Sequence, residues 1–244
     1  MTKKEGKMRQ ELVTKETNLP TELQGSWGSE EIDNEDIVLP KLLLMQAMSE
    51  AVSEKETAEA GDIIKSTSEQ VVGGREKPVK IIPLSCFKTW VLSMKDGSRY
   101  AFKSVEPSTP ANINRALEWT DELGNEWRAD KALNFYVLLP EEITAASNGE
   151  GACIPCLVSF RRTSYMAGRK LASGMKESQF LNQPAASRVY ELRANKRTND
   201  LGTFYVYDVG TAGKATVEQV TFAKQWFDSL KTAKVKIDAV EDEA

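Results

Sequence analysis

The sequence predicts a mainly β protein with added helices, an α+β fold whose short strands form a small β-barrel or a twisted sheet. Strand-like apolar runs recur along the chain, and turns rich in Gly, Asn and Pro separate them. A single long amphipathic helix follows the last of these runs. The chain has 244 residues, 41% of them apolar, which is enough for a substantial core.

Residues 1–35 are predicted to form a mobile acidic arm. Acidic residues outnumber basic ones there, and few apolar side chains are available to offset the entropy of ordering. The folded part is predicted as a single domain over residues 36–236, followed by a short acidic tail at 237–244.

The first half of this domain is predicted to be mostly strands. Residues 36–46 read as strand or helix, because short apolar runs do not reveal their period. Residues 47–60 tolerate a helix, and 63–72 read as a short strand and a turn. Residues 78–84 and 86–93 read as strands. Asp96-Gly97 predicts a hairpin whose return strand ends at residue 105.

Residues 106–130 are predicted to be a long insertion, with one helix near 111–119. A further strand is predicted over 131–140, and a loop over 147–151.

The chain is organised around residues 153–209. A buried strand is predicted over 153–160 and a helix over 162–175, although Gly168 and Gly174 weaken the helix prediction. Two strands, 187–194 and 203–209, follow with a turn-rich connection between them. Thr216 and Gln219 then form a capping-box pattern before the C-terminal amphipathic helix.

Positive charge is concentrated in this region. Between Phe160 and Arg197 there are nine Lys or Arg residues against two acids, a local balance of +7. The whole chain carries −4, so the rest of it sums to −11. An acidic chain that gathers its cations beside aromatic strands is typical of a polyanion-binding protein.

A basic, aromatic β-barrel favours single-stranded nucleic acid as the ligand, and the OB-fold is the common scaffold for this. Strand alternation places Tyr205 and Tyr207 on one face and Phe204 and Val206 on the other. The two tyrosines are therefore predicted to form an exposed stacking platform. The alternative is that they pack under the C-terminal helix.

The chain has no histidine, which removes the commonest general base near neutral pH. No phosphate-binding glycine loop is present either. We therefore expect a binding protein and not an enzyme, with no cofactor and no metal. Cys153 and Cys156 have zinc-ligand or redox-pair spacing, but their apolar surroundings favour buried thiols.

Several segments resemble a group of tailed-bacteriophage single-stranded DNA-binding proteins. They are DIVLPKLLLMQ at 36–46, GD at 61–62, RTSYMAGRKL at 162–171, VYEL at 189–192 and NDLGTFY at 199–205, and the similarity spans residues 36–230. The resemblance implies an OB-like core and a role in phage DNA replication or recombination. It assigns binding to Arg161, Arg162, Tyr165, Arg169 and Lys170, and to the turn at Lys196 and Arg197.

The full predicted interface adds the nearby cations and the two rings, so that it comprises Arg161, Arg162, Tyr165, Arg169, Lys170, Lys176, Arg193, Lys196, Arg197, Tyr205 and Tyr207. The expected partner is single-stranded DNA bound without strong sequence preference. The acidic tail is similar to tails that recruit replication or recombination proteins. The sequence is also compatible with a homo-oligomer.

Two other classes of function stay open. A phage structural or assembly protein would have the same short strands and polar arm. An inhibitor of a host nucleic-acid enzyme would use the acidic remainder of the chain as a mimic of DNA. No secretory signal and no membrane-spanning run is expected, so the expected compartment is the host cytoplasm.

Overall fold

The computed structural model describes residues 38–94, 104–105, 117–120, 123–124, 126–200 and 202–233. These residues fall in one compact unit, which begins at Val38. The predicted arm, the acidic tail and the Asp96-Gly97 turn lie outside the described residues. Within the described ranges, no helix is both long and apolar enough to cross a membrane.

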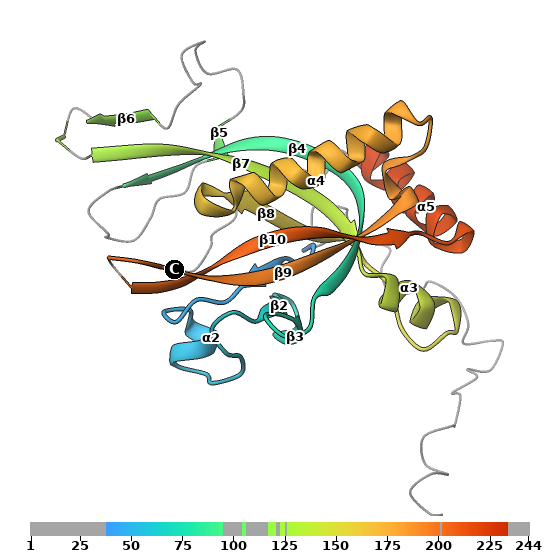
Figure 1. Cartoon of the computed structure of the whole chain (residues 1–244), viewed down its shortest axis with the longest axis horizontal. Helices are drawn as coiled ribbons and strands as arrows, with labels where there is room; N and C mark the ends of the chain where they lie inside the picture. Colours follow the sequence, from blue (N-terminus) through green and yellow to red (C-terminus); the bar gives the residue numbers. More distant parts are fainter. Residues whose placement is uncertain are drawn as a thin grey trace, which may run out of the picture. The chain divides into compact units, whose positions relative to one another are not determined.

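The main element is an antiparallel seven-stranded sheet with the order β10-β9-β4-β7-β6, in which β5 also pairs with β4 and β8 with β7. Its strands are β4 (Val79–Met94), β5 (Ser104–Val105), β6 (Leu117–Thr120), β7 (Glu126–Leu138), β8 (Cys156–Arg161), β9 (Arg188–Asn199) and β10 (Gly202–Lys214). Figure 1 shows the hairpin β9–β10 and the strands β4 and β7 extending toward the same side. The mainly β, α+β class is confirmed.

The sheet is open, so the predicted OB-like barrel is wrong. Among the described strands, β8 pairs with β7 and β10 pairs with β9, and β8 and β10 do not pair with each other. A three-stranded sheet contributes its strand β1 (Leu42–Leu44) between them. Pro40 accepts a hydrogen bond from the Leu157 amide of β8 at 2.8 Å, and Leu42 accepts one from the Tyr207 hydroxyl of β10 at 2.8 Å. Contacts with β1 thus take the place of pairing between β8 and β10.

The outer edge of β10 is capped by side chains. The Gln46 amide bonds both the N–H and the C=O of Tyr205, at 2.9 and 3.0 Å, as a neighbouring strand would. The Ser164 hydroxyl accepts the Tyr207 N–H at 3.0 Å. These bonds satisfy an edge that could otherwise pair with another chain.

Strand β4 is one long strand, where the sequence predicts two. Its first residues pair with β9 and the rest pair with β7. The register shifts between Pro83 and Ser85, which is a bulge of the kind that accommodates proline in a sheet. Because of this shift, Ile81 and Cys86 point to the same face although their numbers differ in parity.

The small sheet has the order β1-β2-β3, with β2 (Ile63–Lys65) and β3 (Gln70–Gly73). The residues that tolerated a helix, 47–60, form only the short α2 (Glu50–Ser53). An ion pair of 2.6 Å between Lys65 and Glu142 connects β2 to the helix α3 (Pro140–Ser147).

Helices cover both faces of the large sheet. They are α3 (Pro140–Ser147), α4 (Tyr165–Phe180) and α5 (Val217–Ala233), and short 3-10 turns lie at η2 (Arg162–Ser164) and η3 (Ala185–Ser187). Figure 1 shows α4 crossing over β7 and β8. The core under α4 includes Phe135, Phe160 and Leu171, and a second core includes Leu138 and Ala223 and holds α3 and α5.

The predicted insertion contains a hairpin. Strand β6 (Leu117–Thr120) covers the last residues of the predicted helix, so that prediction is wrong for residues 117–119. Residues 111–116 lie outside the described part. Trp119 lies opposite Trp127 in this hairpin, and β7 begins at Glu126, earlier than predicted. Helix α3 was not predicted.

Candidate nucleic-acid interface

The candidate interface is built on α4. Strand β8 ends at Arg161, η2 turns the chain, and α4 begins at Tyr165 with no acidic residue in its first turn. The Ser164 side chain makes no capping bond to the helix. The positive end of the helix dipole therefore lies beside Arg161 and Arg162, an arrangement that favours anions.

Two glycines bring α4 close to the sheet. A Cβ on Gly168 would lie 2.7 Å from the Cβ of Phe160, and one on Gly174 would lie 2.5 Å from the Tyr190 hydroxyl. Only glycine fits at such distances. The predicted helix is confirmed and runs further than expected, to Phe180. Its buried side carries Ala167 and Leu171, which fixes the outward face of the helix.

Arg162, one of the predicted ligands, has a structural role in this turn. Its Nε donates to Asp130 Oδ2 at 2.6 Å and its terminal nitrogen donates to Ser93 Oγ at 3.1 Å. The Asp130 side chain is only 6% exposed, and its other oxygen accepts from Arg128 Nε at 2.9 Å. Arg162 adopts φ 47°, a left-handed conformation that is costly for a residue with a side chain. The contacts with Asp130 and Ser93 stabilise this turn.

Two further predicted ligands are paired with acids at the surface. Lys170 Nζ lies 3.4 Å from Asp208 Oδ1, and Arg193 pairs with Glu191. Asp208 also lies opposite Arg193 in the β9–β10 register. Exposed pairs of this kind are worth about 0–1 kcal/mol, so a phosphate can replace the carboxylates.

Four predicted ligands are exposed and form no ion pair with any other residue that the structure describes: Arg169, Lys176, Lys196 and Arg197. Arg169 and Lys176 donate to uncharged side chains, namely those of Met166 and Gln179. Among the predicted ligands, these four side chains are the most available to a polyanion.

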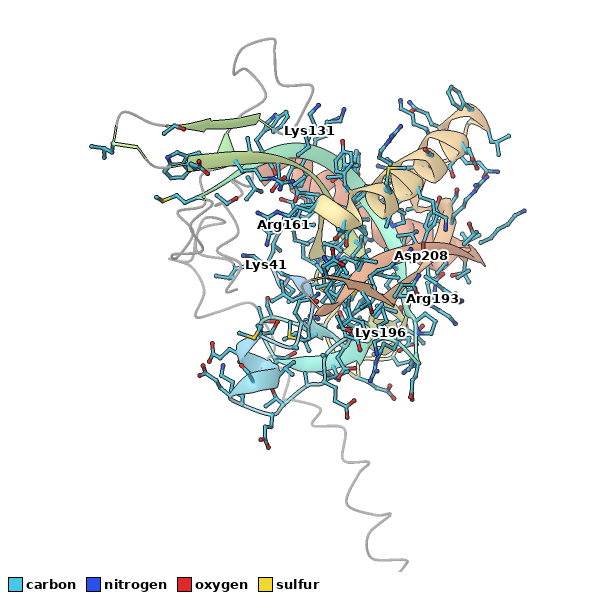
Figure 2. The ribbon with its side chains drawn as sticks, turned by 60° about the vertical axis from the view of Figure 1, so that its left-hand side comes forward. Lys41, Lys131, Arg161, Arg193, Lys196 and Asp208 are labelled. Carbon is cyan, nitrogen blue, oxygen red and sulfur yellow. The ribbon has the colours of Figure 1, made fainter. Side chains whose placement is uncertain are left out.

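Lys196 and Arg197 lie in strand β9 and not in a turn, which corrects their predicted placement. They pair with Tyr205 and Phe204 of β10, and the hairpin closes only between Asn199 and Gly202. Both side chains are exposed, so the β9–β10 ribbon carries charge beyond the last buried residues. In the view of Figure 2, Arg193, Lys196 and Asp208 lie on this ribbon, and Arg161 and Lys131 lie on the β7–β8 side.

Tyr207 is a core residue, so the two-ring platform is wrong. Its side chain is buried, its ring lies 5.4 Å from the Phe160 ring, and its hydroxyl donates to the Leu42 carbonyl. The hydroxyl partner that a buried tyrosine requires is thus supplied by the backbone of β1.

Tyr205 is half-buried and its ring is already engaged. The Arg75 guanidinium carbon lies 5.6 Å from the ring centroid, and Arg75 also donates to the hydroxyl at 3.4 Å. The Tyr205 ring packs so closely on Gly61 that a Cβ there would lie 2.7 Å from it. Tyr205 therefore holds the segment around Gly61 and Arg75 against the ribbon.

The two remaining predicted residues, Arg161 and Tyr165, are half-buried at the ends of β8 and α4. Tyr165 packs partly against the core under α4. Both lie beside the exposed cations without being fully exposed themselves.

The cysteines agree with the buried-thiol interpretation. Cys153 and Cys156 are buried in the two cores, and burial raises the pKa of each thiol to about 12. Thiols of that pKa are poor nucleophiles at neutral pH. In the described part of the chain, no group of three or more Cys, Asp or Glu side chains is placed to hold a metal ion.

Three residues of interest were missed by the sequence analysis. Lys131 lies with its ammonium 5.0 Å from the Trp90 ring centroid, and Arg128 shares Asp130 with Arg162. Phe180, at the end of α4, is 85% exposed. Phe180 could have been found, because it continues the helical spacing of Arg169 and Lys176 by one turn. No local signal indicates the contact of Lys131 with Trp90 or that of Arg128 with Asp130.

Together these features define an α+β protein with an open antiparallel sheet, a helix on each face and a basic outer surface on α4 and the β9–β10 ribbon. The chain belongs to the Pam3 phage gp34-like protein family, whose model matches residues 9–236. A phage family agrees with the resemblance to tailed-phage proteins. No curated protein and no solved structure matches the chain.

Proposed function

We propose that this phage-family protein binds single-stranded DNA through the phosphate backbone, with little sequence preference, as a binding protein in replication or recombination. One observation carries the proposal. Four exposed cations without ion pairs to described residues lie on α4 and the neighbouring ribbon of a chain whose net charge is −4. Packing alone does not require exposed cations of this kind on two adjoining elements of an acidic protein.

The contacts between α4 and β10 support one continuous interface. Ser164, just before α4, accepts the Tyr207 N–H, and Lys170 of α4 reaches Asp208. Arg169 and Lys176 on the helix and Lys196 and Arg197 on the ribbon therefore belong to adjoining elements. A flexible single strand can follow such a path more easily than a stiff duplex.

The test is a titration of fluorescently labelled oligo-dT and of duplex of equal length, at 50 and 200 mM salt. If the four cations each neutralise one phosphate, the affinity for oligo-dT falls about 50-fold between these salt concentrations. Arg169→Gln or Arg197→Gln lowers the magnitude of the salt slope by about 0.7.

The matched control is Lys224→Gln. Lys224 is an exposed lysine of α5 that pairs with Asp228 at 2.5 Å, and its loss changes the net charge equally. We expect its salt slope to stay at the wild-type value. Absence of binding at low salt, or binding independent of salt, contradicts the proposal. Equal affinity for duplex and oligo-dT contradicts the proposed preference for single strands. Stable oligomers without DNA affinity indicate an assembly protein instead.

A further inference from the structure

The outward face of α4 ends in an exposed aromatic ring, which two cations of the same face precede. Phe180 lies two and a half turns beyond the buried Leu171, so it points directly away from the core. Its side chain is 85% exposed, and Met166 on the same face is 64% exposed. No part of the fold as described uses the Phe180 ring.

The charge of this face is positive on the N-terminal side of the ring. Lys176 lies one turn before Phe180, and Arg169 lies further back on the same face. The single acid of α4, Glu177, is held by Arg188 at 2.9 Å. The face therefore attracts an anion and repels a cation, which argues against a basic protein surface as its partner.

Cations neutralise the phosphates of single strands and duplexes alike, and only a ring distinguishes unpaired bases by stacking. Tyr207 is buried and Tyr205 is engaged by Arg75, so neither tyrosine offers a free ring. Phe180 has the most exposed aromatic side chain among the described residues. It has no hydrogen-bonding group, so it would accept any base.

We propose that Phe180 is the base-stacking residue of the protein and that Lys176 and Arg169 hold phosphates of the same single strand. This inference rests on the proposed function, and it assigns the preference for unpaired bases to one side chain on α4. The occupant of the face is single-stranded nucleic acid.

The experiment compares oligo-dT with an abasic strand of equal length and charge. Wild-type protein is expected to bind oligo-dT more tightly, and Phe180→Ala is expected to lose about 5- to 140-fold of its oligo-dT affinity. Its affinity for the abasic strand and its salt slope stay unchanged. Phe180→Trp retains oligo-dT binding, whereas Phe180→Leu, which is apolar without a ring, behaves like Phe180→Ala.

The matched control is Phe227→Ala on α5, which removes a ring that is 40% exposed on another helix. It is expected to leave oligo-dT affinity at the wild-type value. If Phe180→Ala binds oligo-dT as tightly as wild type, the inference is wrong while the proposed function stands. If wild-type protein binds neither strand, the proposed function itself fails.

Light scattering of wild type and Phe180→Ala tests a second explanation, in which the exposed face of α4 binds another copy of the protein. A wild-type dimer that dissociates in Phe180→Ala, with oligo-dT affinity unchanged, identifies the face as a self-association surface and overturns the inference. If wild type and Phe180→Ala have the same mass in solution and Phe180→Ala loses oligo-dT affinity, the inference is supported. Retained oligo-dT binding by Phe180→Leu also overturns it, because it attributes the effect to apolar contact.

Discussion

The helices α4 and α5 have the same task in the fold and different outer surfaces. Each buries one side on the large sheet, α4 against the core that includes Phe160 and α5 against the core that includes Leu138. Helix α5 carries two acids and two bases, whereas α4 carries three bases and one acid. Packing alone does not need the charge or the exposed ring of α4, so the difference between the helices supports the binding role that we propose for α4.

The two helices also form for different reasons. Helix α5 begins with a local capping box, in which the Thr216 hydroxyl accepts the Gln219 N–H at 3.2 Å and Gln219 Oε1 accepts the Thr216 N–H at 3.0 Å. Helix α4 has no such cap and contains two glycines, so its stability depends on its contacts with the sheet. Local signals thus specify α5, and tertiary packing specifies α4.

The largest effect is expected from Tyr207→Ala, which removes a ring from the core on which α4 packs. The free energy of unfolding should fall by about 3–5 kcal/mol, by analogy with Phe truncation, and urea denaturation measures this. The control Tyr205→Ala should lose less stability, because this ring is only half-buried and contacts Arg75 and Gly61 at the edge of the core. If Tyr207→Ala were as stable as wild type but bound DNA weakly, the result would support the predicted stacking platform instead.

A smaller loss of stability is expected from Gly168→Ala, although Gly→Ala usually stabilises a helix. On an exposed helix this change stabilises by about 1 kcal/mol. Here the added Cβ would meet Phe160, so we expect a loss of about 1–3 kcal/mol from overpacking. Ser229→Ala, at an exposed position of α5, is the control and should stay within about 0.5 kcal/mol of wild type. If Gly168→Ala stabilises the protein, α4 does not depend on close approach to the sheet.

Elements with a strong local pattern could be predicted from the sequence. The apolar run of β8, the runs of β9 and β10 and the capping box of α5 all correspond to elements of the structure. Their signals lie within a few residues of one another, and the tertiary structure does not override them.

The errors concern residues whose environment comes from distant parts of the chain. Tyr205 and Tyr207 share one face of β10, and alternation cannot tell where along a strand the core ends. Phe204 and Val206 on the other face are also half-buried or buried, so that the strand has no freely exposed face there. Arg162 meets an acid 32 residues earlier in the chain, Asp130, which no local pattern indicates.

The smallest and sharpest test of the two helices removes one hydroxyl just before each of them. In Thr216→Ala the capping bond to Gln219 is lost, and we expect about 1 kcal/mol of destabilisation and faster hydrogen exchange at the Gln219 amide. In Ser164→Ala the first turn of α4 should exchange as in wild type, because Ser164 makes no capping bond. The Tyr207 amide should exchange faster instead, since the Ser164 hydroxyl accepts its N–H. If Ser164→Ala loosens the first turn of α4 and leaves Tyr207 protected, Ser164 acts as a cap, and α4 begins through a local signal as α5 does.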